Sequence, residues 1–371
     1  MKMKVALIHD HLAQDGGAEK VLKVLSEIYP EATIYTLLYE QKNADKYYKG
    51  RKIETSIIQR LPGGVKHYQW YMPFMPMAVE FFDLSGYDVV ISDTSSFAKG
   101  VITNVDTLHI CYCHTPTRYL WSDTHQYIKE LNYNKYFKKI ISLVLNYVRI
   151  WDKLAADRVD KFIANSNFIA TRIKKYYRRN SVVIYPPVDV EKYSIADKLD
   201  NYFLIGCRLA PYKRVDIAIE AFKESGKKLK IFGDGVDLLR LKEIAKGCEN
   251  IEFIGRISEE EKRELFRHCQ AFIHPQEEDF GITPVEAMAA GRPVIAYKRG
   301  GALETIIEGK TGLFFNEQTS ASLKEACEKF NPDNFNPQEI REWAEKFSTA
   351  RFKDELQEYV NDEFRKYNSS K

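Results

Sequence analysis

Short apolar runs alternate with amphipathic helical patterns along the whole chain, and they form two separate sets. In the first half, the runs that predict strands are 5–8, 88–92, 108–113 and 161–164. In the second half, they are 202–206, 228–232, 251–254, 271–274 and 293–296. Strands that alternate with helices form parallel sheets covered on both faces. The pattern therefore predicts an α/β chain with two doubly wound, Rossmann-like domains.

A double proline separates the two sets. Pro186 and Pro187, in VIYPPVDVEKY, force an extended chain that suits a linker. We expect an N-terminal domain over 1–187, a C-terminal domain over 188–345, and a helical tail over 346–371 that packs back on the N-terminal domain. Two such domains face each other across a cleft, and ligands of doubly wound sheets bind beyond the carboxyl ends of the strands.

Composition indicates a cytoplasmic globular protein. Hydrophobic residues make up 44% and charged residues 29% of the chain, as in ordinary soluble domains. The start, MKMKVALIHDHL, has too short an apolar run for a signal peptide, and YFKKIISLVLNYVRIW carries too many charges to span a membrane. Six cysteines without a CxxC pair predict reduced thiols. His9 and Asp10 would point to opposite faces of a strand, so no metal site is expected.

Charge is distributed unevenly. Residues 1–190 carry 26 Lys and Arg against 19 Asp and Glu, whereas the remaining residues carry 29 against 33. Residues 135–179 hold 12 basic and 3 acidic side chains, interleaved with aromatic and aliphatic ones. Such a stretch is a solvated face or a peripheral contact with an anionic membrane, and nucleic acid is the weakest of the three alternatives. We expect no nucleic-acid partner.

Glycines and cations follow several of the predicted strands. Gly16 and Gly17 precede an amphipathic helix, where a backbone can approach a phosphate closely, although a plain loop explains them equally well. Arg208 and Lys213 stand between a strand and a helix and suit either a diphosphate clamp or surface charge. Further glycine-containing strand ends are IFGDGVD, with Gly233, and FIGRIS, with Arg256.

Two acids flank a loop and a helix start in HPQEEDFGITPVEAMAAGRPVIA. Seven residues separate Glu278 from Glu286. Thr283 is the expected N-cap and Pro284 the first helical residue, which places Glu286 where a capping box has its acid. By spacing alone, Glu286 is either a cap or a ligand-binding residue, and Glu278 is either a solvated loop acid or part of a site.

In their order, these motifs resemble the GT-B-fold retaining glycosyltransferases of family four, the group 1 glycosyltransferases, which include bacterial mannosyltransferases of O-antigen and capsule synthesis. The resemblance covers nearly the full length and includes the early double glycine, CYCHTPTRYLW with His114, NSNFIATRI, Pro-Pro-Val-Asp, Arg and Lys five apart, FGDG, FIGRIS, and the two acids followed by EAMAAGRPVIA. The resemblance implies an acceptor-binding N-terminal domain and a nucleotide-sugar-binding C-terminal domain.

The resemblance also implies roles for these residues. Glu286 would bind the ribose hydroxyls, while Glu278 and the backbone of Asp279, Phe280, Gly281 and Ile282 would hold the donor sugar. Arg208 and Lys213 would take the diphosphate, and His114 would touch the sugar from the first domain. The remaining donor-binding residues would be Gly16, Gly17, Gly233 and Arg256. Asp279 departs from the family, which usually has Gly there, so this loop is expected to be more acidic or differently turned.

The implied reaction is transfer of a sugar with retention of configuration. Charge grows on the leaving phosphate, and Arg208 and Lys213 would neutralise it in place of a metal, because the chain has no Asp-x-Asp element. No cofactor is expected. HTPTRYLW resembles the corresponding segment of transferases of bacterial O-antigen and capsule synthesis, and this resemblance favours GDP-mannose as donor, with UDP-sugars second, and a glycan or polyprenyl-linked acceptor. The alternatives are a sugar-nucleotide epimerase on the same fold and, least favoured, a binding protein without catalysis.

Overall fold

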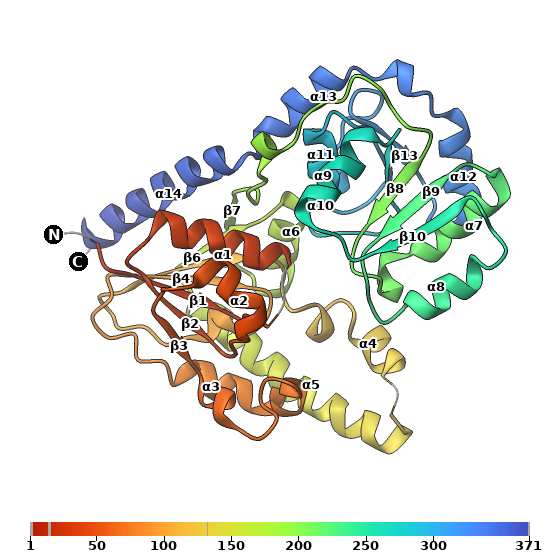
Figure 1. The fold of residues 1–371 in the computed structure, drawn as a ribbon. Helices are drawn as coiled ribbons and strands as arrows, with labels where there is room; N and C mark the ends of the chain where they lie inside the picture. The colour runs from red at the N-terminus through yellow and green to blue at the C-terminus, as the bar shows by residue number, and fades with distance from the viewer. Residues whose placement is uncertain (1–2, 14–15, 132, 370–371) are drawn as a thin grey trace. The chain divides into compact units, whose positions relative to one another are not determined.

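The chain divides into two compact units in a computed structural model, which describes residues 3–13, 16–131 and 133–369 (Figure 1). Unit 1 comprises Met1–Tyr185 and Phe352–Lys371, and unit 2 comprises Pro186–Arg351. The chain thus leaves unit 1 at the double proline and returns to it at residue 352.

A seven-stranded parallel sheet forms the centre of unit 1, in the order β3-β2-β1-β4-β5-β6-β7. The strands are β1 Val5–His9, β2 Thr33–Thr36, β3 Ile53–Thr55, β4 Val89–Thr94, β5 Leu108–Cys113, β6 Lys161–Ala164 and β7 Ser181–Val183. The four strands predicted from apolar runs are the four central ones. Sequence reasoning missed β2, β3 and β7 because they are short and lack a continuous apolar run.

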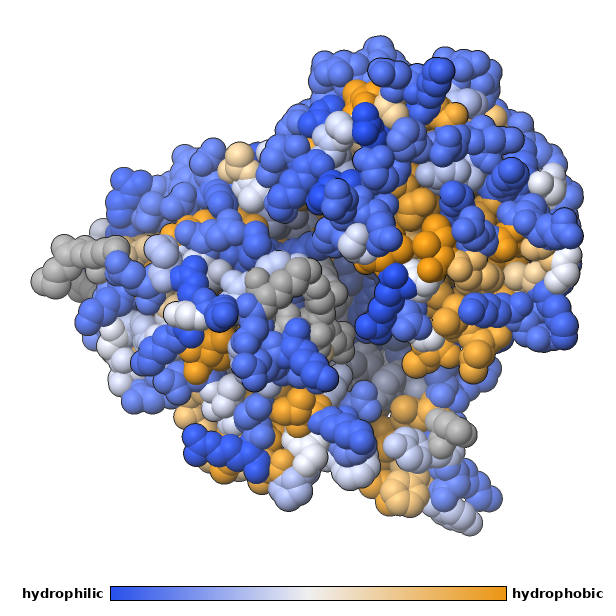
Figure 2. All heavy atoms as spheres, in the orientation of Figure 1, coloured by the Kyte–Doolittle hydropathy of each residue, from blue (hydrophilic) through white to orange (hydrophobic). Residues whose placement is uncertain are grey.

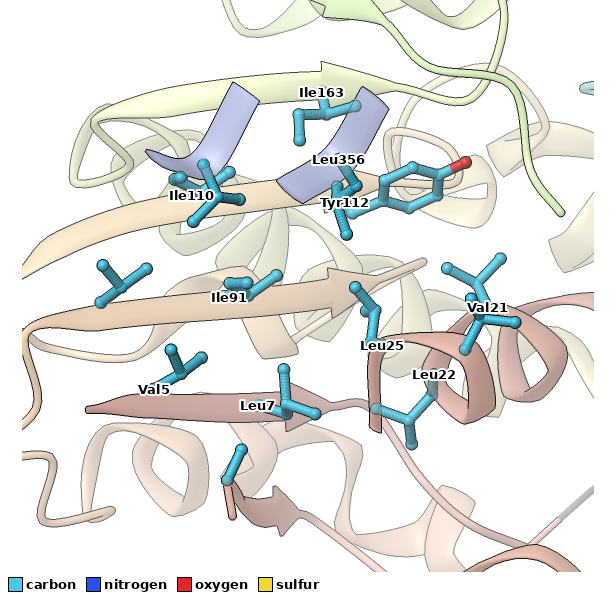
Figure 3. Close-up of a cluster of buried hydrophobic side chains, with 14 of the residues drawn as sticks. Val5, Leu7, Val21, Leu22, Leu25, Ile91, Ile110, Tyr112, Ile163 and Leu356 are labelled. Atoms are coloured by element: carbon cyan, nitrogen blue, oxygen red, sulfur yellow. The ribbon is translucent and has the colours of Figure 1, made fainter. Parts of the chain in front are cut away.

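Helices cover both faces of this sheet. They are α1 Gly17–Ile28, α2 Gln41–Tyr48, α3 Met75–Glu80, α4 Thr124–Glu130, α5 Lys135–Asp157, α6 Asn167–Tyr176 and α14 Thr349–Ser369. Alternate residues of a strand point to opposite faces. Val5 and Leu7 therefore belong to the core cluster under α1, in which Leu356 of α14 lies near Tyr112 and Ile163 (Figure 3), whereas Ala6 and Ile8 pack with α3 and α5.

Unit 2 contains a six-stranded parallel sheet in the order β10-β9-β8-β11-β12-β13. Its strands are β8 Phe203–Gly206, β9 Leu229–Phe232, β10 Ile251–Gly255, β11 Phe272–His274, β12 Val294–Tyr297 and β13 Gly312–Phe315. Its helices are α7 Val215–Ser225, α8 Leu238–Ile244, α9 Glu259–His268, α10 Ile282–Ala289, α11 Ala302–Thr305, α12 Ser320–Lys329 and α13 Pro337–Ala344. Only the edge strand β13 was not predicted.

Both sheets reverse their strand order next to the first strand of the unit. In unit 1, β1 lies between β2 and β4, and in unit 2, β8 lies between β9 and β11. The loops after the two strands at such a reversal diverge to opposite faces, which leaves a crevice at their carboxyl ends. In the described part of the chain, no helix has the length and apolar character needed to cross a bilayer.

Helix α14 is part of the unit 1 core. Phe352, Leu356 and Val360 are fully buried there, one helical turn apart. We expect Leu356→Ala to lower the free energy of unfolding by about 2–5 kcal/mol, because it removes buried methyl groups and leaves a cavity. Urea denaturation of the full chain measures this loss. The control is Gln357→Ala at the neighbouring exposed position, and an equal effect of the two substitutions would contradict the packing.

Candidate active site

The candidate residues of unit 2 gather at the strand-order reversal, after β8 and β11. Arg208 follows β8, is exposed, and its guanidinium donates to the Tyr212 hydroxyl at 2.8 Å. Lys213 ends the short 3₁₀ segment Pro211–Lys213, and its ammonium contacts the Glu278 carboxylate. Burial alone would lower the pKa of Lys213, but Glu278 raises it above the ordinary value. The structure therefore brings two of the predicted residues, one cation and one acid, into direct contact.

The loop that carries Glu278 packs against the backbone of a second pair of glycines, Gly300 and Gly301. The Glu278 carbonyl accepts the Gly301 N–H at 2.8 Å. A Cβ at Gly300 would lie 2.3 Å from the Glu278 carbonyl oxygen, and one at Gly301 would lie 2.4 Å from the Cα of Phe280. Only glycine permits this approach. Sequence reasoning missed both glycines, although they follow β12 and a helix begins at Ala302, much as Gly16 and Gly17 stand before α1.

Helix α10 begins differently from the expectation. Its N-cap is Gly281, with φ of 93°, and its first residue is Ile282, so the assignment of Thr283 as N-cap and Pro284 as first helical residue was wrong. A glycine in the left-handed region starts the helix two residues early. Glu286 is then the fifth helical residue, too far along to be a capping acid. The capping interpretation of Glu286 is therefore wrong.

Glu286 instead makes a buried ion pair. Only 5% of it is exposed, and its carboxylate lies 3.2 Å from the ammonium of Lys262 on α9. Lys262 also pairs with the exposed Glu259 at 2.7 Å. A buried carboxylate needs such a partner because desolvation disfavours its charge. Lys262 was not predicted, since a lysine in a run of charged residues looks like solvated surface.

The backbone between these two acids lies at the start of α10. Asp279, Gly281 and Ile282 are half-buried, and Phe280 is buried with its ring against Phe347, 5.6 Å between centroids. The Phe280 side chain thus anchors the loop, whose polar groups are its peptide groups and the Asp279 carboxylate. Within the described residues, no side chain caps α10.

His274 ends β11 beneath this loop and was not predicted as a site residue. It is 2% exposed, and neither of its ring nitrogens has a hydrogen-bond partner among the residues that the structure describes. A Cβ on Gly281 would lie 3.6 Å from its Nε2. Burial lowers the pKa of His274 to about 4. It is therefore a neutral imidazole under the loop.

Gly233 and Arg256 follow β9 and β10. Gly233 has φ of 118°, and a Cβ there would lie 1.9 Å from the Cys207 carbonyl oxygen, so this position requires glycine. Arg256 is exposed and its guanidinium lies 3.1 Å from the Asp234 carboxylate. Gly233 lets the backbone after β9 approach that after β8, whereas Arg256 stays on the surface.

The candidate residues of unit 1 lie at the reversal of its own sheet. Gly16 is the N-cap of α1 and Gly17 its first residue. His114 directly follows β5, and its Nε2 lies 2.5 Å from a carboxylate oxygen of Asp93, at the end of β4. Sequence reasoning missed Asp93 because it ended this strand at residue 92 and found no motif around the acid that follows. Among the residues that the structure describes, no three His, Cys, Asp or Glu side chains form a group that could hold a metal ion.

The sequence matches two family descriptions that together run from residue 15 to residue 347. Residues 15–192 match "Glycosyltransferase Family 4" and residues 189–347 match "Glycosyl transferases group 1". The chain belongs to the group 1, family 4 glycosyltransferases. The protein is thus an enzyme of a retaining family, a hexosyltransferase by homology.

Relatives of this glycosyltransferase agree with that assignment. The alpha-1,3/1,6-mannosyltransferase ALG2 of Dictyostelium discoideum is 27% identical over 89% of this chain and 89% of its own length. ALG2 of Mus musculus is 26% identical over 78% of this chain and 77% of its own length.

Solved structures show the same GT-B fold. Sucrose-phosphate synthase from Thermosynechococcus elongatus has a TM-score of 0.77 at 15% identity, over 98% of this chain and 100% of that chain. HepE of Anabaena, in complex with UDP, has a TM-score of 0.71 at 18% identity, over 97% and 100%.

The buried His274 should make the free energy of unfolding of this glycosyltransferase depend on pH. The unfolded chain gains a proton on His274 as pH falls through 6.5, whereas the folded chain does not until about pH 4. The free energy of unfolding should therefore fall over this interval, and fall less in His274→Asn. Denaturant titrations between pH 7 and 4 measure it, with His268→Asn at a half-buried position as control. Identical pH dependence of wild type and His274→Asn would contradict this account.

Proposed function

We propose that the glycosyltransferase moves mannose from GDP-mannose to a glycan or polyprenyl-linked acceptor in the synthesis of a bacterial surface polysaccharide. The observation that carries the proposal is the likeness to ALG2 mannosyltransferases over 89% of the chain. The half-buried pair Lys213–Glu278 and the buried pair Lys262–Glu286 of unit 2 support the donor side of it.

In this proposal, each charged candidate residue of unit 2 has one task. Glu286, held by Lys262, accepts hydrogen bonds from the ribose hydroxyls. Arg208 and Lys213 bind the diphosphate, and Glu278 with the peptide groups of 279–282 binds the sugar. Lys213 contacts Glu278 in the structure, so donor binding exchanges part of this ion pair for phosphate contacts.

The proposed reaction needs no metal. The acceptor hydroxyl oxygen attacks the anomeric carbon while the bond from that carbon to the phosphate oxygen breaks, and the leaving phosphate takes the hydroxyl proton. Because Glu278 and Glu286 are both assigned to the donor, attack from the face of the leaving group explains retention better than a carboxylate nucleophile does. Fixed cations stabilise the charge that develops on the phosphate.

A UDP-sugar is the second candidate donor, because HepE of the same fold was crystallised with UDP-glucose. Thermal shift with GDP-mannose, UDP-glucose, dTDP-glucose and ADP-glucose separates the donors, since a ligand at 100 times its Kd stabilises by about 2.7 kcal/mol. A labelled-sugar transfer assay then identifies the product. Stabilisation by UDP-glucose alone would overturn the GDP-mannose proposal, and an epimerised donor would overturn transfer.

Glu286→Gln should weaken nucleotide binding by about 1.5–3 kcal/mol, the contribution of hydrogen bonds to a charged group. Titration calorimetry with GDP measures the change. The matched control is Glu259→Gln, which removes the other partner of Lys262 from an exposed position. Unchanged affinity in a folded Glu286→Gln protein would return this residue to a structural role.

Activity should survive excess EDTA, and the product should keep the donor's anomeric configuration. Replacing Arg208 or Lys213 by Ala should lower kcat by roughly 10²–10³, as when one preorganised transition-state donor is lost. The double variant should lose less than the product of the single losses, because groups that act as one clamp are not additive. Inactivation by EDTA that Mg²⁺ or Mn²⁺ reverses, or an inverted product, would count against the scheme.

We further propose that the protein acts in the cytoplasm, on the inner face of the cell membrane. All six cysteines are free, as expected in a reducing compartment. Helix α5 exposes a row of large apolar side chains three or four residues apart: Tyr136, Ile140, Leu143, Tyr147, Ile150 and Leu154. This row, the α5 stripe, faces away from the core in which Leu145 and Val148 pack.

A second group of exposed apolar residues flanks α3. Trp70 and Phe74 of the 3₁₀ segment Tyr68–Phe74, and Phe81 directly after α3, are more than half exposed. Helix α3 is tied to α5 by the Trp151 Nε1–H bond to Glu80 at 2.8 Å. Figure 2 shows hydrophobic patches among hydrophilic residues at the lower side of unit 1, where Figure 1 has α3 and α5. Exposed apolar surface of this extent marks an interaction site.

Charge favours an anionic bilayer as the partner. Helix α5 carries five Lys and Arg against two Asp, one of which is buried. Pairing α5 with a second copy would bring like charges together, whereas anionic headgroups neutralise them.

Liposome flotation should show binding that rises with anionic lipid content and falls with salt, and Leu143→Gln with Ile150→Gln should abolish it. Leu239→Gln, at an equally exposed leucine of unit 2, is the control. Equal recovery with neutral and anionic vesicles, or a dimer that the double variant disrupts, would overturn the membrane proposal.

A further inference from the structure

Two histidines share one buried carboxylate at the carboxyl edge of the unit 1 sheet. His9 Nδ1 lies 2.8 Å from Asp93 Oδ2, and His114 Nε2 lies 2.5 Å from Asp93 Oδ1. The three residues come from the ends of neighbouring strands β1, β4 and β5. Asp93 is fully buried, His9 is 3% exposed and the His114 side chain is 12% exposed. His114 is thus the member of the group nearest to solvent.

The group continues to the N-terminus of α1. Glu19 Oε1 lies 3.9 Å from His9 Nε2, and Glu19 Oε2 accepts the Gly16 N–H at 2.9 Å. A chain of contacts therefore runs from Gly16 through Glu19, His9 and Asp93 to His114. Its two ends are the residues of unit 1 that the sequence had assigned to the diphosphate and to the sugar.

The inner members of the chain are charged at neutral pH. Burial alone would lower the pKa of His9, but Asp93 and Glu19 raise it to about 10. Burial would raise the pKa of Asp93 and Glu19, yet the histidines hold both below their ordinary values. His11 also interacts electrostatically with His9, but burial lowers the pKa of His11, so it adds no charge at neutral pH.

An ionised Asp93 can only accept hydrogen bonds, which decides the state of both imidazoles. His9 must donate from Nδ1 and His114 must donate from Nε2. His114 then presents Nδ1 as its remaining nitrogen, and its ring cannot rotate without breaking the bond to Asp93. In histidine sites generally, the hydrogen bond made by one ring nitrogen decides which of the two nitrogens carries the proton.

We propose that Asp93, His9 and Glu19 are positioning residues, which hold His114 as its Nε2–H tautomer toward the donor sugar and join it to the Gly16 end of α1. The proposal rests on the proposed function, because it takes His114 as the residue that touches the sugar. A purely structural role explains a buried ion pair less well here: such clusters contribute little net stability compared with apolar packing. Their use at this edge is to fix orientation.

The tautomers can be read directly on the wild-type enzyme. ¹⁵N-labelled histidine spectra at pH 8 should show His114 protonated at Nε2 and His9 protonated at both nitrogens. Assignments come from His114→Gln and His9→Gln. An Nδ1–H tautomer of His114, or titration of His9 near pH 6.5, would overturn the proposal. This measurement needs no donor, so it stands even if the proposed transfer reaction fails.

Kinetics test the consequence. Asp93→Asn should lower kcat roughly 10–100-fold, as loss of the partner that orients a metal-binding histidine does, while GDP affinity stays unchanged. His9→Gln, whose amide still donates to Asp93, should keep more activity than His9→Ala. Ser92→Ala is the control, because Ser92 precedes Asp93 on β4 and makes a buried hydrogen bond to His109 at 2.9 Å. Wild-type kcat in Asp93→Asn would refute the positioning role.

Discussion

Each unit depends on the position of its first strand in the middle of a parallel sheet. Because β1 and β8 have neighbours that continue the sheet in both directions, the loops that follow the central strands separate, and polar groups can occupy the gap. His9, Asp93 and His114 lie there in unit 1, and Arg208 and His274 lie there in unit 2. The strand order of each sheet thus determines which polar residues lie close together.

Charges at these edges are stabilised by one another more than by water. Lys262 compensates the buried Glu286, and Glu278 compensates Lys213. Similar pairing occurs away from the edges, where buried Lys99 contacts buried Asp152 at 2.6 Å. Removing one member of such a pair leaves an unpaired buried charge, which costs more than the pair contributes. In the proposed function, a ligand that binds at the carboxyl end of a sheet therefore replaces one partner of an existing ion pair.

Much of this arrangement was predictable from the sequence, for identifiable reasons. Strands β8, β11 and β12 are short, mostly apolar and buried, which is typical of parallel strands covered on both faces, whereas β9 and β10 each interrupt their apolar residues with one charged residue. Strands β3 and β7 have three residues each and are partly exposed, so they carry no such signal. Glu286 was ambiguous because Thr283 and Pro284 imitate a helix start, and only the φ of Gly281 resolves it. Asp93 depends on contacts across strands 84 and 21 residues apart in sequence, which no local pattern reveals.

The return of α14 to unit 1 has a consequence for how the protein is made. Synthesis proceeds from the N-terminus, and domains generally fold as units during synthesis. The segment that forms unit 2 ends at Arg351, so all of it is synthesised before Phe352, Leu356 and Val360. Unit 1 is translated first, but it lacks these three core residues until its second segment emerges. Its apolar face over β1, β4 and β5 therefore stays uncovered throughout the synthesis of unit 2.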